Sequence, residues 1–175
     1  APLVLIASAY TQLVDQALSA QQKKFVVLSP LNDWEKSEHA GKLWLRYSDA
    51  DTLPQAVNGE DLDCLKFLTG GYSLIYKIRG DVKLDQQHLL LSENHYFKFA
   101  CHIQHAIPNS LLNLINALGL WFIGHHPKNW EDRLIIQTIL QQCQRSERRT
   151  DRMAIDEGAT DRFIKTFWQY RGVNS

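Results

Sequence analysis

The chain has 175 residues, of which 45% are hydrophobic, and this is enough to build the core of one domain. Its 19 basic residues balance its 19 acidic residues, so the formal net charge is zero and no overall positive field attracts nucleic acid or anionic lipid. The longest apolar stretch, residues 111–123, contains two asparagines and is too short to cross a bilayer. We therefore expect neither a membrane nor a nucleic-acid partner.

Cysteine usage and the chain ends indicate the setting of the protein. Cys64, Cys101 and Cys143 are odd in number and widely spaced, which is typical of reduced thiols in the cytoplasm. No charged segment followed by a cleavage site precedes the first apolar run, so we see no signal peptide. Because the sequence starts inside a strand-like run and stops where another strand could begin, we expect a segment of a larger multidomain protein. Its partners would be the other domains of that protein or a second copy.

Strand-like and helix-like apolar patterns alternate along the first half of the chain. The run at residues 25–28 consists of apolar residues only, which is typical of a strand buried on both faces of a sheet. Residues 34–42 give no clear pattern. The expected elements are strands at 3–6, 24–28 and 43–47, a helix at about 11–21, a polar loop at 48–63 and a strand at 74–78.

The second half continues the alternation. A polar turn at 81–87 precedes a short strand at 88–91, and Ser92 then begins a helix. The remaining elements are a helix that opens at 108–110 and stops at Gly119, a strand at 120–123, a helix at 130–144 capped by Asn129, a weak strand at 153–155 and a last helix capped by Thr160.

This alternation predicts an α/β fold: a Rossmann-like, mainly parallel sheet sandwiched by helices, with residues 1–175 forming a single domain. Ligands of such folds bind at the carboxyl ends of the strands. Here those ends are residues 7–10, 78–81 and 124–129, so three separate segments point to one edge of the sheet.

Three of these segments form an ordered set of motifs. One strand ends in Ala7-Ser8-Ala9-Tyr10-Thr11 and leads into a helix with Leu13 and Leu18. The other two motifs are Lys77-Ile78-Arg79-Gly80-Asp81, followed by Leu89–Leu91 and Ser92-Glu93-Asn94-His95-Tyr96, and Ile123-Gly124-His125-His126, followed by Asn129-Trp130 and Arg133. In order and rough spacing, this set resembles the sirtuin-like domains of bacterial defence proteins, a branch of the NAD-consuming sirtuin fold. The matching family motifs are Thr-Thr-Asn-Tyr-Asp, His-Gly-Ser or His-Gly-Asp, and Gly-Tyr-Ser.

The chain departs from the family where the chemistry takes place. The resemblance places the family's catalytic histidine on Arg79, its water-positioning asparagine on Ala9 and an aspartate on Thr11, and its glycine-rich pyrophosphate loop would precede residue 1. Arginine stays protonated and cannot act as a base, and alanine offers only backbone groups. The catalytic positions Ala9 and Arg79 are therefore degenerate.

What the resemblance implies is a ligand-binding or protein-interaction module in a prokaryotic defence or signalling protein. The ligand would be NAD or a compound like ADP-ribose, and no metal is expected. The candidate ligand-binding residues are Ser8, Tyr10, Arg79, Gly124, His125 and Asn129. Two alternatives remain open: an active NAD or nucleotide hydrolase that uses His125 or His126 in a shifted site, and a structural module for oligomerisation or phage sensing.

Arg79 and the paired histidines have simpler interpretations as well. Arg79 could hold a phosphate or carboxylate with two parallel hydrogen bonds, or it could form an ion pair with Asp81 or another acid. His125 and His126 could contact a nucleotide or a metal, but an exposed polar turn explains them more simply.

Three further clusters carry weaker signals. Cys101 and His105 would share a face of one helix, although a metal site would need further ligands and the neighbouring aromatic residues indicate packing. The arginines near the end of the 130–144 helix suit a solvated helix terminus, and the loop aspartates lack the spacing of a metal site. These two clusters comprise Arg145, Arg148, Arg149 and Arg152, and Asp49, Asp51, Asp61 and Asp63.

Overall fold

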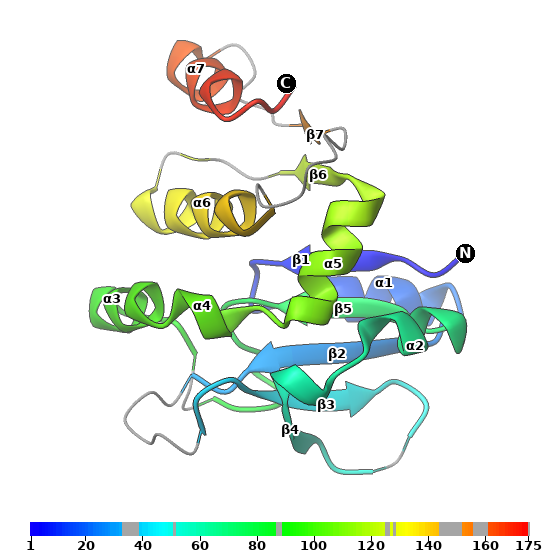
Figure 1. The fold of residues 1–175 in the computed structure, drawn as a ribbon. Helices are drawn as coiled ribbons and strands as arrows, with labels where there is room; N and C mark the ends of the chain where they lie inside the picture. Colours follow the sequence, from blue (N-terminus) through cyan, green and yellow to red (C-terminus); the bar gives the residue numbers. More distant parts are fainter. Residues whose placement is uncertain are drawn as a thin grey trace. The chain divides into compact units, whose positions relative to one another are not determined.

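The computed structural model describes residues 1–32, 39–50, 52–86, 89–124, 127, 129–143, 152–155 and 161–174. The chain divides into two compact units, Ala1–Leu111 and Leu112–Ser175. Each is described by itself below, with its elements labelled in Figure 1. The expectation of a single domain stays a prediction, because two compact units can belong to one domain or to two.

A five-stranded sheet forms the centre of the first unit. Its strand order is β1-β5-β2-β3-β4, and the strands are β1 (Val4–Ala7), β2 (Phe25–Pro30), β3 (Lys42–Tyr47), β4 (Gln55–Asn58) and β5 (Ser73–Lys77). The pairs β1–β5 and β5–β2 are parallel, whereas β3 runs antiparallel to both of its neighbours. Four of the five strands therefore point the same way. The predicted α/β fold with a mainly parallel sheet is confirmed.

Burial follows from the apolar runs of the central strands. Every residue of β2 and of β5 is buried. Phe25, Val27 and Ile75 pack with Leu18 of α1 (Leu13–Ala20) on one face. Tyr76 faces the opposite side because side chains alternate along a strand, and its hydroxyl donates to the carbonyl of Ala106. Both faces of the sheet are thus covered.

The remaining helices of the first unit are short and locally capped. They are α2 (Cys64–Thr69), α3 (Glu93–Cys101) and α4 (Ile103–Ala106), and α5 (Asn109–Leu118) begins in this unit and runs into the second. Asp63 caps α2 by accepting from the amide of Leu65, and Ser92 caps α3 by accepting from the amide of His95. The helix start predicted at Ser92 is confirmed.

Three local predictions in the first unit are wrong. The expected loop at 48–63 contains β4 and a 3-10 turn, η2 (Gly59–Asp61), because the ladder with β3 stabilises a strand that has almost no apolar pattern. Helix α2 was missed because its six residues are too few to show a helical period. Residues 89–91 are not a strand; Leu89 and Leu90 are buried in a loop, where the amide of Leu90 donates to the carbonyl of Arg79.

Among the described residues, the second unit contains most of α5, two parallel strands and two further helices. Strands β6 (Leu120–Ile123) and β7 (Arg152–Ile155) pair in register, and helices α6 (Trp130–Cys143) and α7 (Arg162–Tyr170) supply the rest of the core. The core residues are Phe122, Ile136, Leu140, Ala154, Ile164, Phe167, Trp168 and Val173. The strands predicted at 120–123 and 153–155 are confirmed. Asp161 caps α7, and Thr160, which we expected in that role, lies outside the described residues.

Among the described residues, none of the helices has the length and apolar character that crossing a bilayer requires.

Candidate functional site

Two of the three predicted ligand segments meet at one edge of the five-stranded sheet. Strands β1 and β5 are parallel neighbours with Ala7 opposite Lys77, so the residues that follow them emerge side by side. The hydroxyl of Tyr10 donates to the carbonyl of Leu90 and lies 3.4 Å from the hydroxyl of Tyr96. The guanidinium carbon of Arg79 lies 5.6 Å from the centre of the same Tyr96 ring. Tyr10, Arg79 and Tyr96 thus form one cluster, here called the tyrosine–arginine rim.

The other residues of the first segment differ in exposure. Ser8 is half-buried at the end of β1, whereas Ala9 and Thr11 are exposed. Sequence reasoning named Tyr10 and Arg79 but missed the role of Tyr96, which is buried and contacts both. The sequence around Tyr96 was noted for its resemblance to a family motif, but the contact depends on the tertiary fold.

The third predicted segment belongs to the second unit. Gly124 has a φ of +67°, and its amide donates to the carbonyl of Ile155. The carbonyl of Asn129 accepts from the amide of Arg133 at 3.2 Å, as expected for a residue at the start of α6. His125 and His126 lie outside the described residues. The six candidate residues are therefore divided between the two units.

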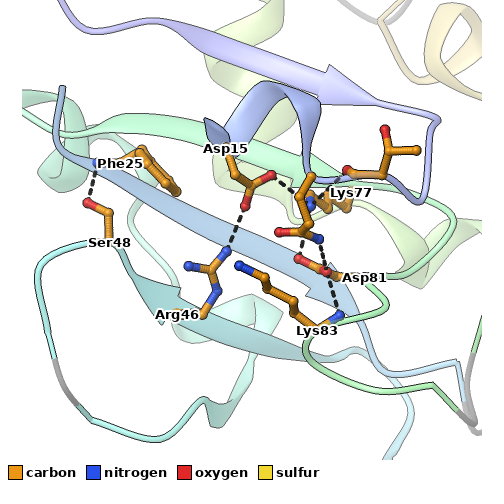
Figure 2. A network of polar contacts seen from close by, with 9 residues as sticks. Asp15, Phe25, Arg46, Ser48, Lys77, Asp81 and Lys83 are labelled. Carbon is orange, nitrogen blue, oxygen red and sulfur yellow. Dashed lines mark hydrogen bonds and ion pairs between the residues drawn. The ribbon is translucent and has the colours of Figure 1, made fainter. Parts of the chain in front are cut away.

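A chain of alternating charges, of which all members but the partly exposed Arg46 are buried, lies beside the rim segments (Figure 2). Arg46 of β3 pairs with Asp15 of α1 at 2.7 Å, Asp15 pairs with Lys77 of β5 at 2.8 Å, and Lys77 pairs with Asp81 at 3.1 Å. The side chains of Lys77 and Asp81 are fully buried, and that of Asp15 is 6% exposed. We call these four residues the buried charge chain.

Hydrogen bonds complete the partners of the buried charge chain. One carboxylate oxygen of Asp81 accepts from the amide of Gln12 at 2.7 Å and from the backbone amide of Lys83 at 2.9 Å. The ammonium of Lys77 also donates to the carbonyl of Thr11 at 3.3 Å. These bonds connect the segments after β1 and β5, which carry Tyr10 and Arg79. The network therefore holds the rim segments in place rather than offering free charge to a ligand.

Sequence reasoning did not find this network. Asp81, the acid proposed as a partner of Arg79, forms an ion pair with Lys77. A lysine at the end of an otherwise apolar buried strand was the available signal, because lysine is almost never fully buried unless it is paired. Its partners Asp15 and Asp81 are far from each other in the sequence and could not be recognised by spacing.

The structure does not support a metal or ligand site at the weaker candidate clusters that it describes. Cys101 and His105 do not share one helix, because α3 ends at Cys101 and α4 begins at Ile103. Asp49 pairs with Lys24 at 3.0 Å, and this bond lowers the pKa of Asp49 and raises that of Lys24. Within the part of the chain that the structure describes, no group of three His, Cys, Asp or Glu side chains could hold a metal ion.

The remaining members of these clusters have local roles or fall outside the description. Asp61 accepts from the side chain of Asn58, and Asp63 caps α2. Arg152 is the first residue of β7. Residues 51, 145, 148 and 149 lie outside the described residues.

No family model matches the chain, and the searches of curated proteins and of solved structures also found no match. The resemblance to sirtuin-like domains therefore stays a prediction. The geometry of the rim stands independently of it.

Proposed function

We propose that this chain is a non-catalytic, sirtuin-like module that binds the anionic part of a nucleotide-like ligand at the tyrosine–arginine rim. It would serve a larger cytoplasmic defence or signalling protein of a prokaryote. The observation that supports this most is the meeting of Tyr10, Arg79 and Tyr96 where two parallel strands end. That edge is where α/β folds bind ligands.

The chemistry of the rim suits binding better than catalysis. A guanidinium is a permanent cation that can hold a phosphate with two parallel hydrogen bonds. It cannot accept a proton, so Arg79 cannot replace a histidine base. Ala9 is exposed and has no side-chain polar group to position water or a ribose hydroxyl.

The ligand proposal is tested by calorimetric titration of the 175-residue chain with NAD, ADP-ribose and cyclic ADP-ribose, with thermal shift as a second readout. We expect one of them to bind and Arg79→Met to weaken it at least about tenfold, since a hydrogen bond to a charged group contributes about 1.5–3 kcal/mol. Arg162→Met is the matched control, because Arg162 is exposed and lies in the second unit.

Two results would overturn this proposal. If none of the three compounds released heat or shifted the unfolding temperature, the proposed nucleotide-like ligand would be refuted. Release of nicotinamide from NAD would refute the proposal that the module is non-catalytic. If the His125→Ala/His126→Ala variant no longer released nicotinamide, a hydrolase with a shifted site would be favoured.

A second candidate function is self-association through the second unit. Trp121 lies opposite Met153, and Ile123 lies opposite Ile155, so all four side chains share one face of the β6–β7 pair. They are 41–68% exposed, and contiguous exposed apolar patches mark interaction surfaces. A formal net charge of zero gives little repulsion between two copies.

Light scattering over a range of concentrations tests the second candidate. We expect a dimer or larger assembly that Trp121→Glu converts to monomer, while Tyr170→Glu, at a residue 89% exposed on α7, leaves the assembly intact. A monomer at every concentration would refute self-association.

A further inference from the structure

A hollow of about 340 Å³ opens in the first unit, and Tyr10, Arg79 and Tyr96 of the tyrosine–arginine rim do not line it. Its lining includes Gly41 before β3, Asn58 at the end of β4, Glu60 of η2, His105 of α4, and Pro108 and Asn109 at the start of α5. None of these residues belongs to the segments that carry the family resemblance. We call this feature the β4–α5 hollow, and its volume lies within the usual range of small-molecule sites, about 300–1,000 Å³.

The walls of the hollow are held by specific bonds. On one side, the amide of Gly59 donates to the carbonyl of Gly41 at 2.9 Å, and a Cβ at Gly59 would lie only 3.0 Å from that oxygen. On the other side, Tyr76 holds the carbonyl of Ala106, and the hydroxyl of Ser110 donates to the sulfur of Cys64 at 3.2 Å. The hollow is therefore preformed rather than dependent on a ligand.

The lining residues determine which ligands fit. Among the described residues of the lining, Glu60 is acidic and none is a lysine or arginine, so these residues offer a phosphate or carboxylate ligand no cationic partner. Quaternary ammonium ligands are recognised by aromatic rings, and the lining residues that the structure describes include no ring of this kind except the imidazole of His105. The charges and rings of the lining thus favour a neutral ligand.

The polar groups of the hollow suit a molecule that carries several hydroxyls. The side-chain amide nitrogen of Asn58 donates to Asp61 at 3.0 Å, which leaves the Asn58 carbonyl oxygen as an acceptor. The Asn109 amide and the His105 ring can donate as well as accept. A carboxylate such as Glu60 can accept from two neighbouring hydroxyls, as acidic residues do with the ribose of bound nucleotides.

We propose that the β4–α5 hollow binds a neutral sugar or polyol with a vicinal diol. Glu60 accepts from the diol, and Asn109 and His105 bond the remaining hydroxyls. This site is independent of the rim, because a neutral sugar carries no phosphate for Arg79.

The test uses the 175-residue chain with isotope-labelled histidine, titrated with D-ribose and, as a matched ligand, 2-deoxy-D-ribose, which lacks one hydroxyl of the diol. We expect the His105 NMR signals to shift saturably with ribose and the deoxy sugar to bind about tenfold more weakly, because one hydrogen bond to a charged group is lost. Glu60→Gln should weaken ribose binding by a similar factor. Ala40→Trp, at an exposed lining residue, should fill the hollow and abolish the shift.

Glu93→Gln is the control variant, since Glu93 is exposed at the start of α3 and does not line the hollow. The proposal is overturned by the absence of a saturable His105 shift, by equal binding of the two sugars, or by unchanged binding in Glu60→Gln. A failure of the rim proposal is a separate result, because it is scored with nucleotides and Arg79→Met.

Discussion

Replacing Lys77 by methionine should destabilise the first unit strongly. Lys77 joins Asp15 at 2.8 Å and Asp81 at 3.1 Å, and all three side chains are buried. Removing one member of a buried ion pair costs about 3–5 kcal/mol, because the partner's charge is left uncompensated. Asp15 keeps Arg46, and Asp81 keeps its bond from Gln12, so we expect the lower end of that range, about 3 kcal/mol.

A loss of about 3 kcal/mol lowers the midpoint of thermal unfolding by roughly 6–12 °C for a chain of this length. Urea unfolding followed by circular dichroism measures the free energy directly. Lys24→Met is the matched control: Lys24 also pairs with an aspartate, at 3.0 Å, but its side chain is 61% exposed, so its loss should change stability little. If Lys77→Met were no less stable than Lys24→Met, the structural role of the buried charge chain would be refuted.

A double-mutant cycle separates the ion pair from the general cost of the substitution. Asp81→Asn keeps the oxygen that accepts from Gln12 and from the amide of Lys83, but removes the charge that faces Lys77. Contacting residues of one network usually couple by about 0.5–3 kcal/mol. We expect the double variant to be more stable than the sum of the single losses predicts. Additive losses would show that Lys77 and Asp81 do not interact.

Three more predictions concern single groups of the first unit. Burial raises the pKa of Tyr76 above its ordinary value of 10.0, so the unfolded chain loses a proton that the folded chain keeps. Stability should fall above pH 10 by about 1.4 kcal/mol per pH unit in urea titrations, and Tyr76→Phe should flatten this slope. Burial also raises the pKa of the Cys64 thiol, whereas Cys101 is exposed, so a thiol reagent should label Cys101 first and Cys64 only after denaturation. Gly80 has a φ of +103°, and Gly80→Ala should cost about 1–3 kcal/mol of unfolding free energy and weaken binding at Arg79; an unchanged urea midpoint would contradict the strain.

Local sequence patterns predicted the elements that have a continuous apolar run or a capping residue. The continuous apolar residues of β2 indicated a strand buried on both faces, the apolar run of β5 indicated a second strand, and the polar cap at Ser92 indicated the start of α3. Patterns failed at β4, an edge strand whose residues are mostly exposed, because its conformation depends on the ladder with β3. They also failed at the break after Cys101, since the residues on both sides remain helical.

The candidate site was also predicted only in part from the sequence. The order of strands and helices placed Tyr10 and Arg79 at the ends of parallel strands, because the direction of a parallel strand follows from the alternation of elements along the chain. Tyr96 contacts both residues only because of the tertiary fold, and no spacing rule in the sequence predicts this contact.

The sequence by itself determined the α/β class and the segments that end at the rim, because apolar periodicity and capping residues act over a few neighbouring residues. Only the tertiary structure decided which charge neutralises which and which polar groups share a hollow. Arg46 and Asp15 are 31 positions apart, and Glu60 of η2 lines the same hollow as His105 of α4. Such pairs depend on strand order and on burial. Burial strengthens the interaction between charges because water is excluded. Neither strand order nor burial can be read from the local sequence.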